Sequence, residues 1–188
     1  SVAALGALAF NDKVGFPWFA PAGFNRAGLD FVSNADVRLD KSDRDKVYDA
    51  RINPIVHFPR QGTTPTFVIF GQKTLQATKS ALDRVNVRRM MLEVKRIVAT
   101  ITREGFVFEQ NTPDTRKRWV SQVTPRLGLV QVQQGIEAFQ VVMDETNNTQ
   151  EDVENNRLNG RIVLVPTRTV EFIAVDFIIT NSGVSFLE

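Results

Sequence analysis

The sequence has no cysteine among its 188 residues, which excludes a disulfide scaffold, a thiolate zinc site and a cysteine nucleophile. It has a single histidine, His57, so any metal site built from several histidines is excluded as well. A chain of this length buries roughly two-thirds of its unfolded surface when it folds, and it therefore needs no covalent or metal staple. The absence of thiols fits a reducing compartment.

The chain also lacks a large excess of either charge, because its 23 Lys and Arg residues nearly balance its 21 Asp and Glu residues, for a net charge of +2. Such a balance favours neither nucleic acid nor an anionic membrane as an obligate partner. The apolar start, residues 2–10, is too short to span a bilayer and lacks the basic residues that open a signal peptide. The first residue is Ser rather than Met, and we expect the chain to be a processed or truncated piece of a longer protein.

Residues 1–35 are rich in glycine, proline and phenylalanine, and the run 15–23 has no helical or strand period. We expect residues 1–35, and above all the run 15–23, to form an ordered loop pinned by aromatic side chains. Residues 36–50 alternate in charge, and Ser42 is expected to cap a short helix that runs to Ala50. A solvated face explains this alternation in most proteins.

Hydrophobic periodicity predicts the other elements. Apolar residues at every third or fourth position predict a long helix from the N-cap Ser80 to Gly105. The run Thr112-Pro113-Asp114 starts a second helix, whose apolar face includes Trp119 and which Pro125 should kink or end early. Strands are expected at 52–59, 67–70, 136–143, 161–166 and 170–180, with a short helix capped by Thr149 that reaches about Asn156.

This order of elements indicates an α+β fold with mixed α/β layers. We expect a small mixed sheet with two main helices packed on it, preceded by the long ordered N-terminal loop segment. The chain divides into residues 1–50, a loop-rich segment with a short helix that belongs to the same or a neighbouring domain, and residues 51–188, the main domain.

No set of residues points to catalysis or to a bound metal. His57 lies in an apolar strand between two prolines, where a structural role is the common one, and no nucleophile motif accompanies it. The Gly71–Thr74 run lacks the glycine spacing of a phosphate loop. Acidic residues at 144–154 lack the spacing of a calcium loop. We therefore expect no catalytic residue, no metal and no cofactor.

Charge is unevenly distributed along the chain. From Lys73 to Arg103 eight basic residues face two acidic ones, for a net charge of +6, whereas residues 137–156 carry six acids and no base. Three interpretations are open: nucleic-acid binding by the basic helix, pairing within the chain, and a head-to-tail contact between copies, which generates rings or helical tubes. The candidate charged contacts are Arg84, Arg88, Arg89, Lys95, Arg96, Glu151, Asp152 and Glu154.

The predicted C-terminal strand, residues 170–180, is apolar on both faces and is followed by a short tail. An unpaired strand of this kind invites pairing with another chain. The candidate inter-subunit strand residues are Val170, Phe172, Ile173, Val175, Phe177 and Ile179.

From about residue 15 onward, a series of short runs resembles the C-terminal part of tail sheath proteins from contractile-tailed bacteriophages. The most specific are Gly71-Gln72-Lys73-Thr74-Leu75, Val85-Asn86-Val87-Arg88-Arg89 and Asp144-Glu145-Thr146-Asn147-Asn148-Thr149. Further matching runs are residues 16–26, 52–56, 70–76, 82–89, 106–109 and 170–173, the last leading into Asp176 and Phe177. Within the family the runs fit best the sheath of a giant phage of the phiKZ type.

The resemblance implies a structural subunit that polymerises around a tail tube and contracts to drive the tube through the host envelope. It implies copies of itself, the tube protein and the baseplate as partners, with no nucleic acid and no membrane insertion. It also implies synthesis in the bacterial cytoplasm and a final place in the virion tail. Terminal arms in this family add strands to a neighbour's sheet, and we expect the isolated fragment to be monomeric. A nucleic-acid-binding module and a small hydrolase are the alternative functions.

Overall fold

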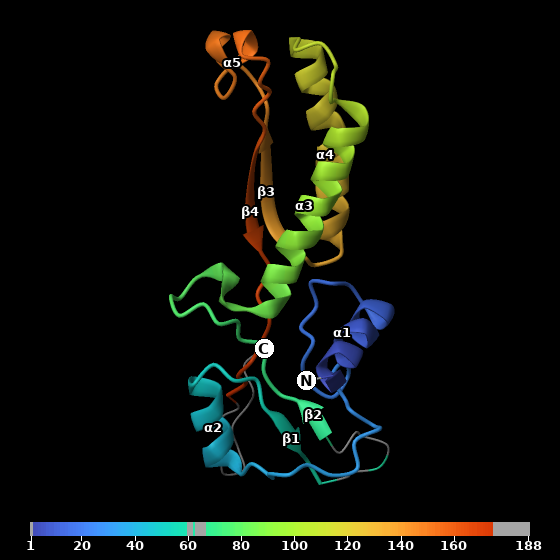
Figure 1. The fold of residues 1–188 in the computed structure, drawn as a ribbon, viewed down its shortest axis with the longest axis vertical. Coiled ribbons are helices and arrows are strands. Elements are labelled where there is room, and N and C mark those ends of the chain that lie inside the picture. Colours follow the sequence, from blue (N-terminus) through green and yellow to red (C-terminus); the bar gives the residue numbers. More distant parts are fainter. Residues whose placement is uncertain (1, 60–61, 63–66, 175–188) are drawn as a thin grey trace, which may run out of the picture.

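The computed structural model describes residues 2–59, 62 and 67–174 (Figure 1). Its elements are α1 (Val2–Val14), α2 (Lys41–Asp49), β1 (Ile55–His57), β2 (Phe67–Ile69), a 3₁₀ turn η1 (Ala81–Asp83), α3 (Val85–Gly105), α4 (Pro113–Val132), β3 (Ile136–Val142), α5 (Gln150–Glu154) and β4 (Arg161–Pro166). The predicted α+β class is confirmed. Over the described ranges, no helix combines the length and the apolar character that crossing a membrane requires.

The molecule is elongated, with α3, α4 and the β3–β4 hairpin along its length and α1, α2 and the β1–β2 pair at one end (Figure 1). Instead of one mixed sheet, the described strands form two separate antiparallel pairs. β1 pairs with β2 from Ile55 opposite Ile69, and β3 pairs with β4 from Val142 opposite Arg161. The β3–β4 hairpin lies alongside the long helices, whereas the β1–β2 pair lies at one end of the molecule, and the two pairs share no ladder.

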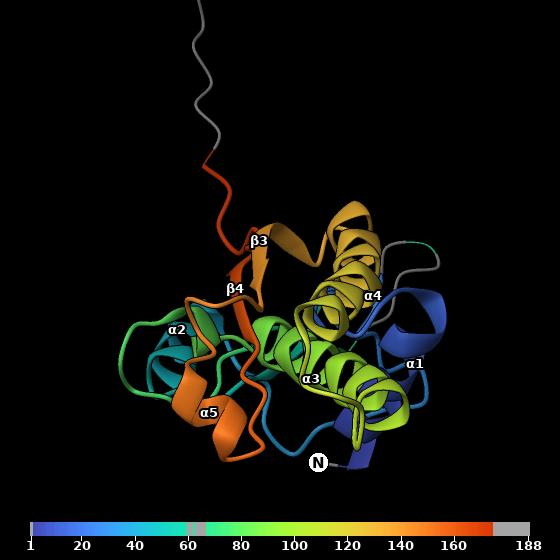
Figure 2. The same cartoon turned by 90° about the horizontal axis from the view of Figure 1, so that it is seen from above.

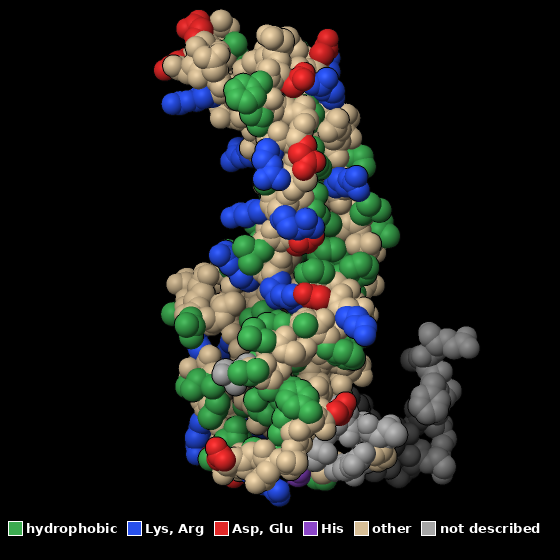
Figure 3. Space-filling view, turned by 45° about the vertical axis from the view of Figure 1, so that its right-hand side comes forward, with side chains coloured by type: hydrophobic (Ala, Val, Ile, Leu, Met, Phe, Trp, Pro, Cys, Tyr) green, Lys and Arg blue, Asp and Glu red, His purple; other side chains and the backbone are tan. Residues whose placement is uncertain are grey.

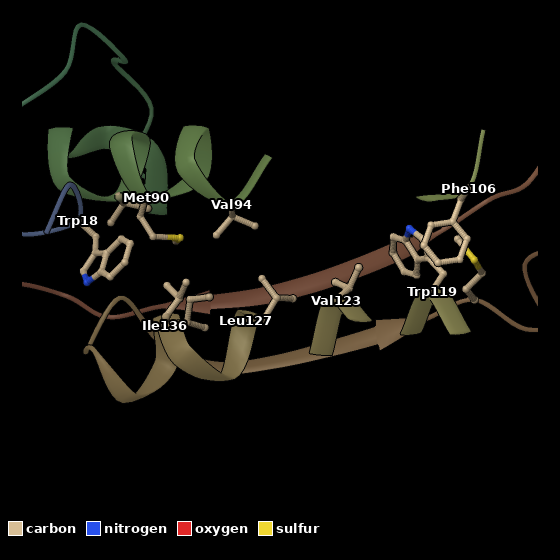
Figure 4. Close-up of a cluster of buried hydrophobic side chains, with 11 residues drawn as sticks. Trp18, Met90, Val94, Phe106, Trp119, Val123, Leu127 and Ile136 are labelled. Atoms are coloured by element: carbon tan, nitrogen blue, oxygen red, sulfur yellow. The ribbon is translucent and has the colours of Figure 1, made fainter. Parts of the chain in front are cut away.

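The main core lies between α3 on one side and α4 with the β3–β4 hairpin on the other (Figure 4). Val123 and Leu127 of α4 are fully buried, and Met90 of α3 and Ile136 of β3 are nearly so. This arrangement confirms the predicted apolar faces of both helices. The indole N–H groups of both tryptophans are hydrogen-bonded. Trp18 Nε1 donates to the carbonyl of Gln133 at 2.8 Å, and Trp119 Nε1 donates to Thr102 Oγ1 at 2.9 Å.

The Gly15–Gly23 run is the ordered aromatic loop that the sequence predicts. The rings of Phe16 and Trp18 stack with centroids 5.0 Å apart, and Trp18 fixes the loop to the main core. A backbone without regular hydrogen bonds is thus held by burial of aromatic side chains.

The expectation that residues 1–14 belong to this loop is wrong, because Val2–Val14 forms α1. Alanine and leucine, which favour helices, make up much of this stretch. Its periodicity is hidden because the exposed face is apolar too: Ala7 is buried in a second cluster with Leu29 and Phe67, whereas Leu5 remains 67% exposed. A helix that is apolar all round gives no amphipathic signal.

Three helix boundaries differ from the prediction. Asp40, not Ser42, caps α2 by accepting from the backbone N–H of Asp43 at 2.8 Å. Ser80 caps the η1 turn, and α3 starts only at Val85. Pro125 does not end α4, which continues to Val132. Proline costs a helix one hydrogen bond, and the buried side chains that follow it, such as Leu127, hold the last turns in place.

Candidate assembly surfaces

The candidate inter-subunit strand is only partly within the described residues. Residues 170–174 form no helix or strand, so the strand predicted there is absent from this part of the chain. Val170, Phe172 and Ile173 are 78%, 80% and 81% exposed. The segment leads away from the body of the molecule (Figure 2). A strand needs a partner for its backbone hydrogen bonds, and none lies beside these residues in the described chain. Val175, Phe177 and Ile179 lie outside the described residues.

Glu171 ties this segment to the rest of the domain. Its side chain is 18% exposed, in contrast to its apolar neighbours. The carboxylate accepts from Arg84 Nε at 2.7 Å and Nη2 at 3.1 Å, from the Tyr48 hydroxyl at 2.7 Å and from Gln72 Nε2 at 3.2 Å. Gln72 Nε2 also donates to Thr169 Oγ1, two residues earlier in the segment. The carboxylate is therefore fully supplied with donors.

The electrostatics of Glu171 favour its charged form. Burial raises its pKa, but the hydrogen bonds from Arg84, Tyr48 and Gln72 outweigh burial and leave the pKa below the ordinary glutamate value. Burial, and then the hydrogen bond from its hydroxyl to Glu171, raise the pKa of Tyr48. The separate hydrogen bonds from Arg84 to Glu171 raise the pKa of Arg84. Near neutral pH the group is thus a carboxylate held by a neutral phenol, an amide and a guanidinium.

Both strands of the β3–β4 hairpin have a partner on one side only within the described chain. Val163 and Val165 on the outer face of β4 are 48% and 45% exposed. A two-stranded sheet is marginal by itself, and its free edges present unpaired N–H and C=O groups to another strand. These edges are the natural acceptors for an added strand.

A hollow of about 540 Å³ lies between α4 and the end of β3. On the strand side it is lined by the consecutive residues Val141 and Val142, which end β3, and by Met143 and Asp144, which follow the strand. Because successive strand residues point to opposite faces, the hollow borders the edge of β3 rather than one face of it. On the helix side it is lined by Lys117, Val120, Ser121, Thr124 and Pro125.

The candidate basic contacts fall into two groups. Arg84, Arg89 and Arg96 are held within the chain, with Arg89 Nη2 2.5 Å from Asp12 and Arg96 Nη2 2.5 Å from Glu93. Arg88 and Lys95 form no ion pair with any described residue. Lys and Arg side chains form a column along the helical part of the molecule (Figure 3). This column remains available to an acidic partner.

The candidate acidic contacts lie on or beside α5. Thr149 caps α5 as predicted and forms a capping box with Asp152. The backbone N–H and hydroxyl of Thr149 lower the pKa of Asp152. Glu151 and Glu154 form no ion pair with described residues. Across the described chain, no ion pair joins the 73–103 segment to the 137–156 segment, which argues against pairing between these two segments.

The single histidine, His57, has a structural role. His57 packs edge-on against Phe67 with ring centroids 5.0 Å apart. Among the described residues, no three His, Cys, Asp or Glu side chains converge as metal ligands would. The ring packing of His57 against Phe67 agrees with the expectation of a structural histidine.

Sequence analysis missed Tyr48, Gln72 and Glu171 as a group. A signal was present, because Gln72, Arg84 and Glu171 each fall in a run that resembles tail sheath proteins. The runs are far apart in sequence, and only the fold brings them together.

Comparison with known proteins identifies relatives over almost the whole chain, although no family model matches it. The chain is 36% identical over 97% of its length to the tail sheath protein of Vibrio phage KVP40, and 30% identical over 97% to that of Enterobacteria phage T4. It is 27% identical over 90% to the tail sheath protein of Salmonella phage ViI. The chain spans only 26–27% of the length of these relatives. The finer resemblance to phiKZ-type phages is not tested by these matches and stays a prediction.

Solved structures share the fold. A chain of the anti-feeding prophage baseplate superposes with a TM-score of 0.83 over 94% of this chain and 49% of that one, at 23% identity. A chain of the contracted PVC sheath complex, an extracellular contractile injection system, gives a TM-score of 0.81 over 93% of this chain and 49% of that one, at 24% identity. The sequence relatives show that nearly the whole chain is similar to a part of phage tail sheath proteins that makes up about a quarter of their length, and the solved structures show that the fold is shared.

Proposed function

We propose that the chain is part of the structural subunit of a contractile phage tail sheath. In the complete protein, copies of the subunit polymerise around the tail tube, attach to the baseplate and contract to drive the tube through the host envelope. The subunit is made in the bacterial cytoplasm and functions in the virion. It acts without a catalytic site, because the work comes from rearrangement of subunit contacts.

The observation that carries this proposal is the 36% identity to a tail sheath protein over 97% of the chain. Neighbours with the same fold come from a sheath complex and a baseplate of contractile injection systems, which supports self-assembly and baseplate association. The tube as partner rests on the family resemblance.

The surfaces suggest how copies are joined. Residues 170–174 leave one subunit with exposed apolar side chains, and the β3–β4 hairpin of another offers free edges. Strand addition would connect the two through main-chain hydrogen bonds, which follow the added chain wherever it bends. Such a link suits a lattice whose subunits must stay connected while they slide past one another.

Full-length protein, purified and viewed by negative-stain electron microscopy, tests the proposed function. Regular tubes or stacked rings are expected. Persistent monomers under conditions that assemble a related sheath would contradict it, and so would a stoichiometric metal or a hydrolytic activity that one Asp or Glu substitution abolishes.

The hollow beside β3 provides a sharper test of strand addition. Thr124→Trp places a bulky side chain in the hollow at an exposed position of α4, so the core should be undisturbed. We expect the full-length variant to fold normally and to lose most of its tube formation. Gln122→Trp, on the same helix but outside the hollow, is the matched control. Equal tube formation by the two variants would exclude this edge as an acceptor.

The charged residues fit a head-to-tail contact between copies. Arg88 and Lys95 lie on α3, and Glu151 and Glu154 lie on α5 at the far end of the helical half (Figure 1). In a heterologous contact, the basic column of one subunit faces the acidic α5 of the next. The assembly keeps an unused basic column at one end and an unused acidic α5 at the other, so further subunits can be added.

The basic column is also the feature that supports the alternative function, a nucleic-acid-binding module. We expect no duplex DNA binding at physiological salt tighter than the roughly 10⁻⁶ M end of the non-specific range. Fluorescence anisotropy with a labelled duplex, measured at two salt concentrations, checks this. A dissociation constant well below that limit would favour the nucleic-acid function.

A further inference from the structure

Glu171 is the last described residue whose side chain is held by the body of the domain. The residues that flank it, Val170 and Phe172, are 78% and 80% exposed, and Ile173 and Ala174 are exposed as well. Among the described residues, 172–174 therefore start from a single fixed point, Glu171. The direction in which the segment leaves the domain depends on how firmly that point is held.

The groups that hold Glu171 come from three parts of the chain. Tyr48 belongs to α2, Gln72 follows β2, and Arg84 is the N-cap residue of α3. Gln72 is buried, and Arg84 is itself fixed by Asp83 at 3.2 Å and by a β-bridge to Lys73. The donors are thus part of the rigid domain and do not need to be ordered when the segment docks.

The geometry of the Arg84–Glu171 pair fixes orientation as well as position. Two parallel N–H donors of the guanidinium meet the two carboxylate oxygens, Nε on Oε1 and Nη2 on Oε2. A bidentate pair constrains the carboxylate plane in a way that a single contact does not. Tyr48 adds a donor from the α2 side, so rotation of the side chain breaks at least one bond.

We propose that Glu171 is a positioning residue, which anchors the root of the C-terminal segment to α2 and α3 so that the residues beyond it leave in one direction, toward a neighbouring copy. This inference rests on the proposed function, because the neighbouring copy belongs to it. A preset exit direction lowers the entropy lost when the segment is captured. The anchor also carries tension along the segment into α3 rather than into the short β3–β4 hairpin.

An ordinary partly exposed ion pair would have a different signature. Such pairs contribute little to global stability, so the melting temperature does not distinguish the two roles. Local order in the segment and assembly of the full-length protein do distinguish them. The Asp12–Arg89 pair, which also ties α3 to another part of the chain, supplies the matched control Asp12→Asn.

The first test is ¹⁵N relaxation of the backbone amides of residues 169–173 in this chain. We expect order parameters near those of rigid backbone, about 0.85, which fall below about 0.6 in Glu171→Ala and Glu171→Gln and stay unchanged in Asp12→Asn. Wild-type order parameters already in the flexible range, or no change in Glu171→Ala, would overturn the anchor. This test needs no assembly, so it is independent of the proposed function.

A pH profile of the same order parameters separates the charge from the shape of the side chain. The groups facing Glu171 are Tyr48 from α2, Gln72 after β2, and Arg84, the N-cap of α3, which also pairs with Asp83 of η1. Because the pKa of Glu171 is lowered in the folded chain, the anchor is complete above the ordinary glutamate pKa of about 4.3 and is lost as the pH falls further, through the lowered pKa. Order that is constant from pH 7 to pH 3 in the folded wild type, or a profile shared by Glu171→Gln, would contradict the anchor.

The second test is assembly of the full-length protein. Glu171→Ala is expected to raise the concentration needed for tube formation at least about tenfold, while Asp12→Asn leaves it unchanged; tenfold corresponds to about 1.4 kcal/mol. Loosened order with unchanged assembly would overturn the positioning role. Failure of wild-type protein to form tubes would count against the proposed function instead, with the anchor still decided by the relaxation data.

Discussion

Replacing Trp119 by alanine is expected to lower the free energy of unfolding by about 3–5 kcal/mol. The side chain is 2% exposed and lies in the main core, in contact with Gly160 and hydrogen-bonded to Thr102. Its removal leaves a large cavity and an unpaired hydroxyl. For a chain of this size the melting temperature should fall by about 6–20 °C, measurable by circular dichroism or calorimetry.

Two further variants make this result specific. Val132→Ala changes an 82% exposed residue on the same helix and should shift stability by no more than about 0.5 kcal/mol. Trp119→Phe keeps most of the ring and loses the hydrogen bond, so an intermediate loss is expected. If Trp119→Ala melted with the wild type, the packing of α4 on the β3–β4 hairpin would be wrong.

Deleting residues 181–188 from the full-length protein is expected to weaken or abolish tube formation without unfolding the domain. The tail follows the candidate donor segment and lies outside the described residues, whereas every residue of the main core precedes it. Strand addition gains its energy from consecutive main-chain hydrogen bonds, so a shortened donor holds its neighbour less well.

Sedimentation and electron microscopy check this deletion, with circular dichroism to confirm that the domain remains folded. The present chain, which covers about a quarter of its relatives, should sediment as a monomer because it carries only part of the subunit contacts. Regular tubes from this chain alone, or unimpaired polymerisation of the deletion variant, would rule out arm exchange.

The helical core was predictable because its sequence signals are local and periodic. Leu82 to Ile101 repeats every three or four residues, and Thr112-Pro113-Asp114 combines a cap, a first-turn proline and an acid at the helix dipole. Strands β3 and β4 were predictable for the same reason. α1 was not, because its exposed face is as apolar as its buried one.

The candidate surfaces depend on what pairs with what, which local patterns do not contain. Val170–Ala174 has strand-forming residues but no partner in the described chain, so composition alone predicts a strand where the fold leaves an unpaired segment. Glu171 looks like one more surface acid until Tyr48, Gln72 and Arg84 are brought beside it. Long-range convergence of this kind is decided by tertiary packing.

Cryo-electron microscopy of the assembled full-length sheath tests the central claim most directly, because it traces each chain from Glu171 onward. The account predicts that this segment leaves its own domain at Glu171 and adds as a strand to a free edge of a neighbour's β3–β4 hairpin. A segment that folds back on its own subunit, or hairpin edges that stay unpaired in the assembled sheath, would contradict it.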